Sequence, residues 1–334
     1  MRVLFATYPW AFETPGGGEI QLQKYADHLP SHGVEVRLHD PWSANLDQAS
    51  VFHFFSCMGG STHLCNYVKQ RGLPLVISSS LWLTDATRHR YPVAEIRAQL
   101  SLADLVITNS IMESDALARV LDLPQELFAV VANGFEPRFA TATPTAFREA
   151  FPVPETFVLN IGNLEPRKNQ LTLVRALKRL GLPLVLIGHL RDRAYAEQVF
   201  AEGGSRLHYL GPLDHGDPRL ASAFAACNVF VLPSVLETPG LAALEAAAAG
   251  APLVLTAEGS TREYFEGLAD YVDPSDPGRI AAGVENALAN GRNPLLKAHV
   301  EKNYSWPLVT KALPALYRLA QSRHQARAAG LTSK

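Results

Sequence analysis

The sequence predicts an α/β protein of two doubly wound domains, each with a parallel sheet that has helices on both faces. Short apolar runs without polar alternation recur along the chain, as expected of strands that are buried on both faces. Helical patterns separate these runs, which favours repeated βαβ units. The chain has 334 residues, a length that fits two domains of about 150 residues each.

The first domain begins with an apolar strand directly after Met1 and Arg2. Glu13 and a glycine triplet follow this strand without a small-residue cleavage site, so we interpret the start as structure and not as a leader. Helical patterns are present at 20–29 and 113–121. The expected strands are 3–7, 34–39, 51–55, 75–78, 105–108 and 129–131.

The second domain repeats the same alternation of apolar runs and helical patterns. Its helices are expected at 170–180, 220–226 and 241–249. A last helix at 306–323 is expected to pack back on the first domain. The expected strands are 157–161, 184–187, 207–210, 229–232 and 253–256.

The stretch 133–156 contains several prolines and few apolar positions, so we expect it to link the two domains. The predicted parts are then an N-terminal domain at 1–150, a C-terminal domain at 151–304, and a terminal helix with a tail at 305–334. Active sites of doubly wound folds lie at the carboxyl ends of the strands, so two facing sheets would define one interdomain cleft.

The composition excludes several classes of protein. Apolar residues make up 47% of the chain, charged residues 19%, and the net charge is −2, so there is no electrostatic argument for a nucleic-acid partner. Cys57, Cys65 and Cys227 are odd in number and widely spaced, which suits a reducing cytoplasm and predicts no zinc cluster. No apolar run approaches the roughly 18 residues of a membrane span.

The most informative segment begins after the predicted strand at 229–232. Glu237 and Glu245 flank the start of an alanine-rich helix, and Pro239 and Gly240 suit its entry. The free amides of Gly240, Leu241 and the next residue would form an anion site for a diphosphate. In the alternative interpretation, Glu237 is only an acid that the helix dipole favours at the start of the helix, and Glu245 is a solvated surface residue. We favour the first, because a carboxylate in an apolar helix needs a partner.

A second glycine-rich segment joins the first strand to the first helix. Gly16, Gly17 and Gly18 would let a ligand approach the backbone closely, although a tight turn alone is the alternative. The segment does not match the G-x-G-x-x-G dinucleotide fingerprint, and Asp40 is only a candidate for the acidic residue that completes it.

Two cations follow the first strand of the second domain. Arg167 and Lys168 come just before a predicted helix, where positive charge opposes the helix dipole. Their presence there indicates that they bind an anion. The alternative is a solvated basic pair. Together with the free amides, these side chains would stabilise the charge of a departing nucleoside diphosphate.

An ordered set of motifs resembles the retaining glycosyltransferases of the GT-B fold, specifically family four of the sugar-nucleotide-dependent enzymes. The resemblance covers nearly the whole chain in the right order. The motifs are G-G-G-E at 16–19, A-D-L-V-I-T-N-S at 103–110, N-G-F-E-P at 133–137, G-N-L-E-P-R-K-N at 162–169, L-G-P-L at 210–213 and Glu-x(7)-Glu at 237–245.

The resemblance implies a role for each candidate residue. Lys168 and Arg167 look like the pair that holds the diphosphate, Glu237 like the acid at the donor sugar and Glu245 like the ribose ligand. The first domain would bind the acceptor and the second the nucleotide-sugar, with no metal or other cofactor. The remaining donor-binding candidates are Gly16, Gly17, Gly18, Asn163, Gly211, Thr238, Pro239, Gly240 and Leu241.

The chain departs from the family's pattern at three positions. Asn163 stands where many relatives have an arginine, and Pro239 where many have a phenylalanine. Ser80 is at about the position of a histidine that many relatives carry after the fourth strand. His53 is the nearest substitute for that histidine by position, and the alternative interpretation is that it is a structural residue. Trp82 is a third candidate on the acceptor side.

These assignments imply a hexosyltransferase that moves a sugar from a nucleoside diphosphate to an acceptor hydroxyl with retention of configuration. No Asp-x-Asp occurs in the sequence, which agrees with a metal-free site. The product would be a polysaccharide or another glycoconjugate, and the acceptor a carbohydrate, a glycolipid or a small molecule. Membrane association is expected to be peripheral at most.

Three alternatives remain. A sugar-nucleotide epimerase of the same fold would need an acid and a base on opposite faces of the sugar, and no such pair is evident. A nicotinamide-dependent oxidoreductase shares the doubly wound fold but lacks the glycine fingerprint here. A non-catalytic carbohydrate- or protein-binding module would leave Arg167, Lys168 and Glu237 without a purpose.

Overall fold

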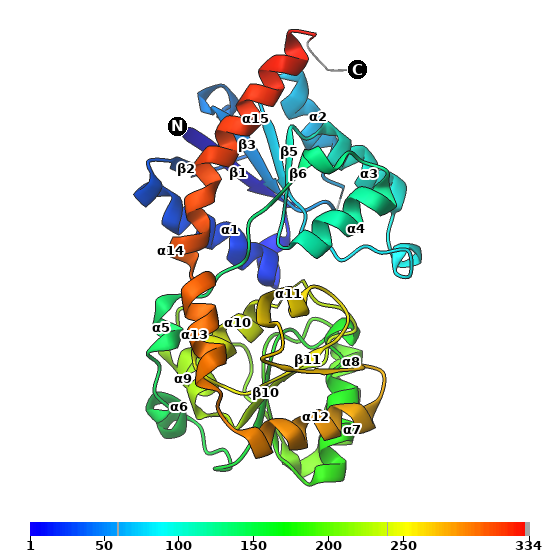
Figure 1. Ribbon diagram of the computed structural model, residues 1–334, viewed down its shortest axis with the longest axis vertical. Helices are drawn as coiled ribbons and strands as arrows, with labels where there is room; N and C mark the ends of the chain where they lie inside the picture. Colours follow the sequence, from blue (N-terminus) through cyan, green and yellow to red (C-terminus); the bar gives the residue numbers. More distant parts are fainter. Residues whose placement is uncertain (59, 239, 331–334) are drawn as a thin grey trace. The chain divides into compact units, whose positions relative to one another are not determined.

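The computed structural model describes residues 1–58, 60–238 and 240–330 (Figure 1). The chain divides into two compact units. The first unit contains Met1–Asn133 together with the segment from Trp306 onward, and the second contains Gly134–Ser305. The predicted class is confirmed, because each unit contains a six-stranded sheet with helices packed around it.

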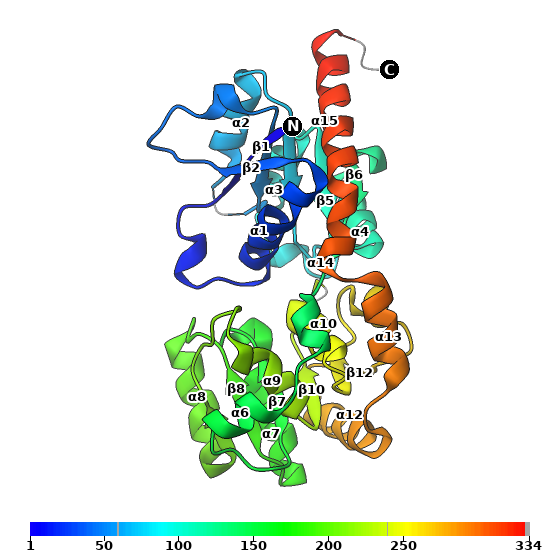
Figure 2. The ribbon, with the colours of Figure 1, turned by 90° about the vertical axis from the view of Figure 1, so that its left-hand side faces the viewer.

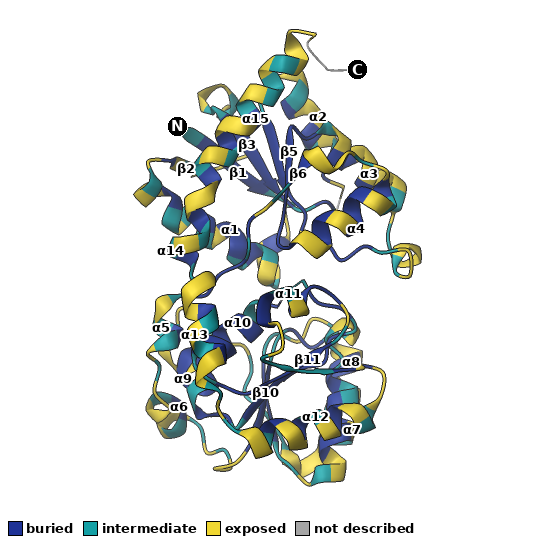
Figure 3. Ribbon diagram, viewed as in Figure 1, coloured by how far each residue is buried: buried dark blue, intermediate teal, exposed yellow. Residues whose placement is uncertain are grey.

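All neighbouring strands of the first sheet are parallel, in the order β2-β1-β3-β4-β5-β6. Val3 pairs with Val36 on one side and with Val51 on the other, so the strand order reverses between β1 and β3. The central strands are wholly buried (Figure 3). The strands are β1 (Arg2–Thr7), β2 (Glu35–Leu38), β3 (Val51–Phe55), β4 (Leu75–Ser78), β5 (Leu105–Thr108) and β6 (Phe128–Val130).

The C-terminal helix packs on the first sheet, as predicted. In Figure 2 this helix, α15, runs alongside the strands of the first unit, and it contacts β3, β4 and β5. Its buried side chains include Leu313 and Tyr317. The other main helices of this unit are α1 (Gly17–His28), α2 (Thr62–Gln70), α3 (Val93–Leu102), α4 (Ile111–Leu121) and α14 (Trp306–Val309), and α15 itself is Leu313–Ala328.

Asp104 anchors the C-terminal helix. Its side chain is fully buried, and its carboxylate lies 2.7 Å from Lys69 Nζ, 3.2 Å from His324 Nδ1 and 3.3 Å from Arg327 Nη1. It also accepts a hydrogen bond from the Leu75 amide at 2.9 Å. One buried carboxylate thus ties α15 to α2 and to the start of β4, at several distant points of the sequence.

The second sheet is also parallel, in the order β12-β11-β10-β7-β8-β9. Its order reverses between β7 and β10. The edge strand β12 was not expected, because its residues are only partly buried and lack a continuous apolar run. The strands are β7 (Val158–Ile161), β8 (Leu184–Ile187), β9 (Leu207–Tyr209), β10 (Val229–Leu232), β11 (Leu253–Thr256) and β12 (Asp270–Val272).

Helices on both faces of the second sheet enclose its core. Leu173 and Leu177 of α7 pack with Val199 and Val284 in one cluster of buried side chains. The helices are α7 (Gln170–Leu180), α8 (Arg193–Gly203), α9 (Pro218–Ala226), α10 (Leu241–Ala248), α11 (Thr261–Phe265), α12 (Pro277–Asn290) and α13 (Pro294–Asn303).

The stretch 133–156 is not a free linker, which corrects the prediction. It folds into α5 (Pro137–Ala140) and α6 (Thr145–Ala150), and α6 packs on α9. Phe139 and Phe147 are fully buried, so two aromatic side chains fix the segment to the second unit despite its prolines. The division between units therefore falls between 133 and 134 and not at 150–151.

Two features are absent from the described residues. No helix in this part of the chain is both long enough and apolar enough to cross a membrane. Among the same residues, no three histidine, cysteine, aspartate or glutamate side chains cluster as metal ligands would. Cys57, Cys65 and Cys227 are buried and free.

Candidate functional site

The reversal of strand order in the second sheet brings two segments together. One follows β7 and carries Lys168, and the other follows β10 and carries Glu237. Adjacent parallel strands at a point of reversal send their chains to opposite faces, so a crevice opens at their carboxyl ends. The predicted cation and the predicted acid therefore lie at the position where doubly wound folds bind ligands.

Lys168 and Glu237 form an ion pair. Lys168 Nζ lies 2.7 Å from Glu237 Oε2, and the two side chains are only 14% and 7% exposed. Ser234 Oγ donates a second hydrogen bond to Oε2 at 2.8 Å. Arg167 is more exposed and reaches Glu237 Oε1 only at 4.0 Å, while it donates to Glu165 at 2.8 Å. Of the two predicted cations, Lys168 makes the closer contact with the acid.

The environment keeps Glu237 ionised. Burial raises its pKa, but the positive charges of Lys168 and Arg167 outweigh this effect, so the pKa of Glu237 lies below its ordinary value. Burial also lowers the pKa of Lys168, and the attraction of Glu237 opposes this. The two groups can hold opposite charges at neutral pH. If an incoming anion attracts Lys168, the lysine still has a negatively charged partner.

Two glycines shape the backbone around Glu237. Gly240 has φ +86°, and a Cβ atom there would lie 2.7 Å from a Leu232 methyl group. At Gly259, with φ +118°, a Cβ atom would come within 1.9 Å of the Glu237 carbonyl oxygen. Glu237 also forms an isolated parallel bridge with Gly259. A side chain at Gly259 would therefore displace the segment that carries the acid.

The N-terminus of α10 begins directly after this segment. Gly240 precedes the helix and provides no side-chain cap. Within the described parts of the chain, no acceptor lies within hydrogen-bond distance of the Leu241 and Ala242 amides. Such amides at the positive end of a helix dipole can bind an anion, which agrees with the prediction. Thr238 is half-buried, and Pro239 lies outside the described residues.

Glu245 is buried inside α10, as the alanine-rich sequence suggested, and is not solvated. Its partner is His215, whose Nε2 lies 2.5 Å from Glu245 Oε1. The sequence indicated that Glu245 needs a partner but did not identify His215. This histidine is 30 residues away, in the connection between β9 and α9. A buried carboxylate in an apolar helix was the only available signal.

Asn163 and Gly211 lie at the same edge of the sheet. Gly162 and Gly188 follow β7 and β8, and a Cβ atom on Gly188 would come within 2.1 Å of the Gly162 carbonyl oxygen. The Gly188 amide donates to the Gly211 carbonyl at 3.0 Å. Asn163 is buried, and its carbonyl accepts from Gln170 Nε2 at 3.0 Å. Close packing of backbone at this edge thus depends on glycine.

In the first unit, the glycine triplet forms the start of a helix. Gly16 precedes α1, and Gly17 and Gly18 are its first two residues. Glu19 accepts hydrogen bonds from the Gly16 amide at 2.7 Å and from the Tyr8 hydroxyl at 2.8 Å. A Cβ atom on Gly18 would meet nothing within 4 Å. The space beside Gly18 is therefore open, and no packing contact of its own chain requires glycine there.

His53 is a structural residue, which corrects its assignment to the acceptor side. It is fully buried in β3, with Nδ1 3.0 Å from the Tyr317 hydroxyl and Nε2 2.9 Å from Ser78 Oγ. Burial lowers its pKa from 6.5 to about 3, so the ring is neutral. It is the middle residue of β3 and not at a strand end, and the C-terminal helix covers it through Tyr317.

Ser80 is the exposed member of a buried polar network. Its φ is +46°, which is unusual for a residue other than glycine. Its hydroxyl accepts from Asn109 Nδ2 at 3.0 Å and donates to Gln21 Oε1 at 3.3 Å. Gln21 Nε2 donates to both Asn109 and Asn133 at 2.7 Å. Trp82 is buried beside this segment, so Ser80 is the more accessible of the two candidates.

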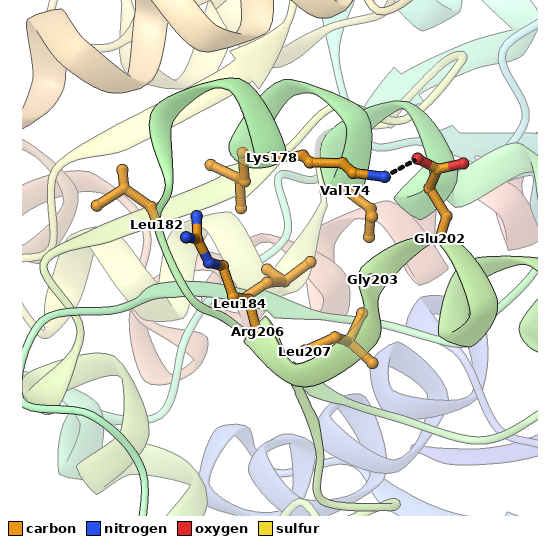
Figure 4. A pocket seen from close by; sticks show the side chains of 9 residues that line it. Val174, Lys178, Leu182, Leu184, Glu202, Gly203, Arg206 and Leu207 are labelled. Carbon is orange, nitrogen blue, oxygen red and sulfur yellow. Dashed lines mark hydrogen bonds and ion pairs between the residues drawn. The ribbon is translucent and has the colours of Figure 1, made fainter.

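A small pocket elsewhere in the second unit is not part of this site. It lies where α7 and α8 end and β8 and β9 begin, at the opposite end of the strands (Figure 4). Leu184 and Leu207 line it, and an ion pair of 3.0 Å joins Lys178 to Glu202 at its side. Arg206 and several aliphatic side chains complete its lining, and neither Lys168 nor Glu237 contributes to it.

Comparison with known proteins agrees with this geometry. Residues 143–306, most of the second unit, match the family described as glycosyl transferases group 1. An uncharacterised glycosyltransferase of Methanocaldococcus jannaschii is 30% identical over 235 residues, which are 64% of this chain and 60% of the relative. Over these residues the chain is similar to group 1 glycosyltransferases. It aligns with only about 60% of that relative's length.

Solved structures share the fold of this chain over nearly all its length. Sucrose-phosphate synthase from Thermosynechococcus elongatus has a TM-score of 0.75 at 20% identity and covers 95% of this chain and 98% of its own. HepE from Anabaena, in complex with UDP-glucose, has a TM-score of 0.70 at 20% identity and covers both chains completely. The GT-B fold predicted from the sequence motifs is therefore confirmed.

Proposed function

We propose that the protein transfers a hexose from a nucleoside diphosphate to an acceptor hydroxyl, with retention of configuration at the anomeric carbon and without a metal ion. The observation that carries the proposal is the ion pair of Lys168 and Glu237 beside the uncapped N-terminus of α10. The family match over residues 143–306 supports the general reaction, and the grouped residues support the donor class.

In this proposal the diphosphate binds the amides of Leu241 and Ala242 and the ammonium group of Lys168. As the bond between the anomeric carbon and the leaving oxygen breaks, negative charge grows on the diphosphate. The helix dipole and Lys168 stabilise that charge, with Arg167 as a more exposed second cation. The acceptor oxygen forms the new bond to the anomeric carbon, and its proton passes to the departing diphosphate oxygen.

Glu237 is proposed to accept hydrogen bonds from hydroxyls of the donor sugar. An ionised carboxylate accepts hydrogen bonds through two oxygens. The Oε2 atom of Glu237 already has Lys168 and Ser234 as partners. Oε1 has a more distant neighbour, Arg167 Nη1 at 4.0 Å. We therefore expect Oε1 to be the atom that meets the sugar.

The acceptor is proposed to bind the first unit at the carboxyl edge of its own sheet, where Ser80 is exposed. The buried network of Gln21, Asn109 and Asn133 holds the Ser80 hydroxyl in one orientation. Hydroxyl and amide groups in such a network suit a carbohydrate or another polyhydroxyl compound. The glycines at 16–18 are proposed to contribute to donor binding through their backbone.

Binding of nucleoside diphosphates tests the proposal directly. We would titrate the protein with the diphosphates of uridine, guanosine, adenosine and thymidine by calorimetry, with NAD as the control. Uridine comes first, because HepE from Anabaena is described with UDP-glucose. One diphosphate should bind clearly better than the others, and binding of NAD alone would instead support an oxidoreductase.

Turnover distinguishes the transferase from its alternatives. Incubation with the matching nucleotide-sugar and a carbohydrate acceptor should release the nucleoside diphosphate, and NMR of the glycoside product should show the donor's anomeric configuration. The rate should be unchanged by a chelator of divalent cations. Conversion of the nucleotide-sugar into its epimer without release of diphosphate would contradict transfer, and binding without any conversion would support a carbohydrate-binding protein.

A further inference from the structure

The contact of His215 with Glu245 is not used by the chemistry proposed above. His215 Nε2 lies 2.5 Å from Glu245 Oε1, and the side chains are 18% and 5% exposed. Glu245 is the one ionisable residue of α10, whose other residues are alanine and leucine. A buried carboxylate costs free energy unless it has hydrogen-bond donors, so this histidine stabilises it.

The backbone and the ring of His215 are themselves held in place. The Arg138 guanidinium group donates a hydrogen bond to the His215 carbonyl oxygen and lies 4.3 Å over the ring of Phe139. The ring centre of His215 lies 5.7 Å from that of Phe139. Shortly after it, Asp217 caps α9 through the Arg219 amide. The histidine therefore has a defined position before it meets Glu245.

This arrangement leaves part of the carboxylate for a ligand. An ionised carboxylate has two oxygens that only accept hydrogen bonds, and His215 uses Oε1. Across the described residues, Oε2 of Glu245 has no hydrogen-bond partner. The vicinal hydroxyls of a ribose are donors of the kind that a fixed carboxylate binds.

We propose that His215 is a positioning residue for the ribose of the nucleotide. It holds Glu245 in the one orientation that directs Oε2 at the ribose hydroxyls, and it does not touch the nucleotide itself. This inference rests on the proposed function, because it takes the ligand to be a nucleoside diphosphate. Fixing a flexible carboxylate before binding raises affinity by removing the entropy cost of ordering it.

The test compares a ligand that has the ribose hydroxyls with one that lacks them. We would measure by calorimetry the binding of UDP, or of the diphosphate selected by the panel above, and of its 2′,3′-dideoxy form. The proteins are wild type, His215→Ala, His215→Gln and, as a matched control, His208→Ala. His208 is a half-buried histidine of the same unit on β9.

We expect His215→Ala to weaken UDP binding roughly 10-fold, the effect of one charge-assisted hydrogen bond, and to leave binding of the dideoxy form unchanged. His215→Gln should recover part of the affinity, because its side-chain amide can donate to the carboxylate. His208→Ala should behave as wild type. A thermal unfolding curve for each variant shows that the compared proteins are folded.

Two outcomes would overturn the inference while the proposed function stands. One is an equal loss of affinity for both ligands in His215→Ala, which indicates a general structural role. The other is a wild-type protein that binds both ligands equally, because Glu245 is then not a ribose ligand. If the wild type binds no nucleoside diphosphate at all, the proposed function itself is wrong. If His215→Ala does not fold, the ratio measured on His215→Gln decides.

Discussion

Lys168 Nζ and Glu237 Oε2 lie 2.7 Å apart although 69 residues separate them in the sequence. Each residue follows a strand of the second sheet, and these strands, β7 and β10, are neighbours only because the strand order reverses between them. The ion pair thus depends on the topology of the sheet, and it brings a cation and an acid to the edge where we propose that the donor binds.

Replacing Lys168 by alanine should abolish measurable nucleoside diphosphate binding and lower the free energy of unfolding by about 3 kcal/mol, because Glu237 loses its main partner inside the protein. Calorimetry and urea denaturation would measure the two effects. Lys178→Ala is the matched control: this lysine is 67% exposed and pairs with Glu202, so neither quantity should change by much. Undiminished binding in Lys168→Ala would contradict the assigned phosphate contact.

Replacing Gly259 by alanine should damage the site without touching a charged residue. The new Cβ atom would clash with the Glu237 carbonyl oxygen in a backbone conformation that favours glycine, at a cost of about 3 kcal/mol or more. We therefore expect lower stability together with weaker nucleotide binding. Gly267→Ala, where a Cβ atom meets nothing within 4 Å, should change stability by at most about 0.5 kcal/mol. Similar melting curves for the two variants would refute this account.

His53 should make the stability of the first unit depend on pH. Its pKa falls from 6.5 to about 3 on folding, so between these values the unfolded chain binds a proton that the folded protein does not. Stability is then full above pH 6.5 and is lost as the pH falls below it, by up to about 1.4 kcal/mol per pH unit. Urea denaturation between pH 7 and pH 4 should show a shallower dependence for His53→Gln than for wild type. The exposed His89→Gln should keep the wild-type slope, and parallel curves for all three proteins would disprove the assignment.

Neutralising Asp104 should loosen the C-terminal helix. Asp104→Asn keeps an acceptor for the Leu75 amide but leaves Lys69, His324 and Arg327 without their shared charge, so we expect a loss of about 3 kcal/mol. Hydrogen exchange of the α15 amides should become faster. The exposed pair of Asp47 with Arg71 provides the control, because Asp47→Asn should cost less than about 1 kcal/mol. Unchanged exchange in Asp104→Asn would mean that apolar contacts alone hold the helix.

The fold class and most of the strands follow from local patterns in the sequence. Runs such as 51–55, 184–187 and 229–232 are buried on both faces. Their largely apolar composition predicts this burial. The helix at 241–248 could also be predicted, because its residues favour helix and a glycine stands at each end. These features depend on neighbours in the sequence.

Local patterns do not show which distant groups meet, and here the folded structure is needed. His53 was a candidate for the acceptor side by its residue type, but packing against Tyr317 makes it part of the core. The segment 133–156 had the prolines of a linker, but burial of Phe139 and Phe147 outweighed that local signal. The contact of His215 with Glu245 depends on how the connection after β9 folds over α10. Local periodicity encodes burial, whereas contacts across the chain depend on strand order and side-chain packing.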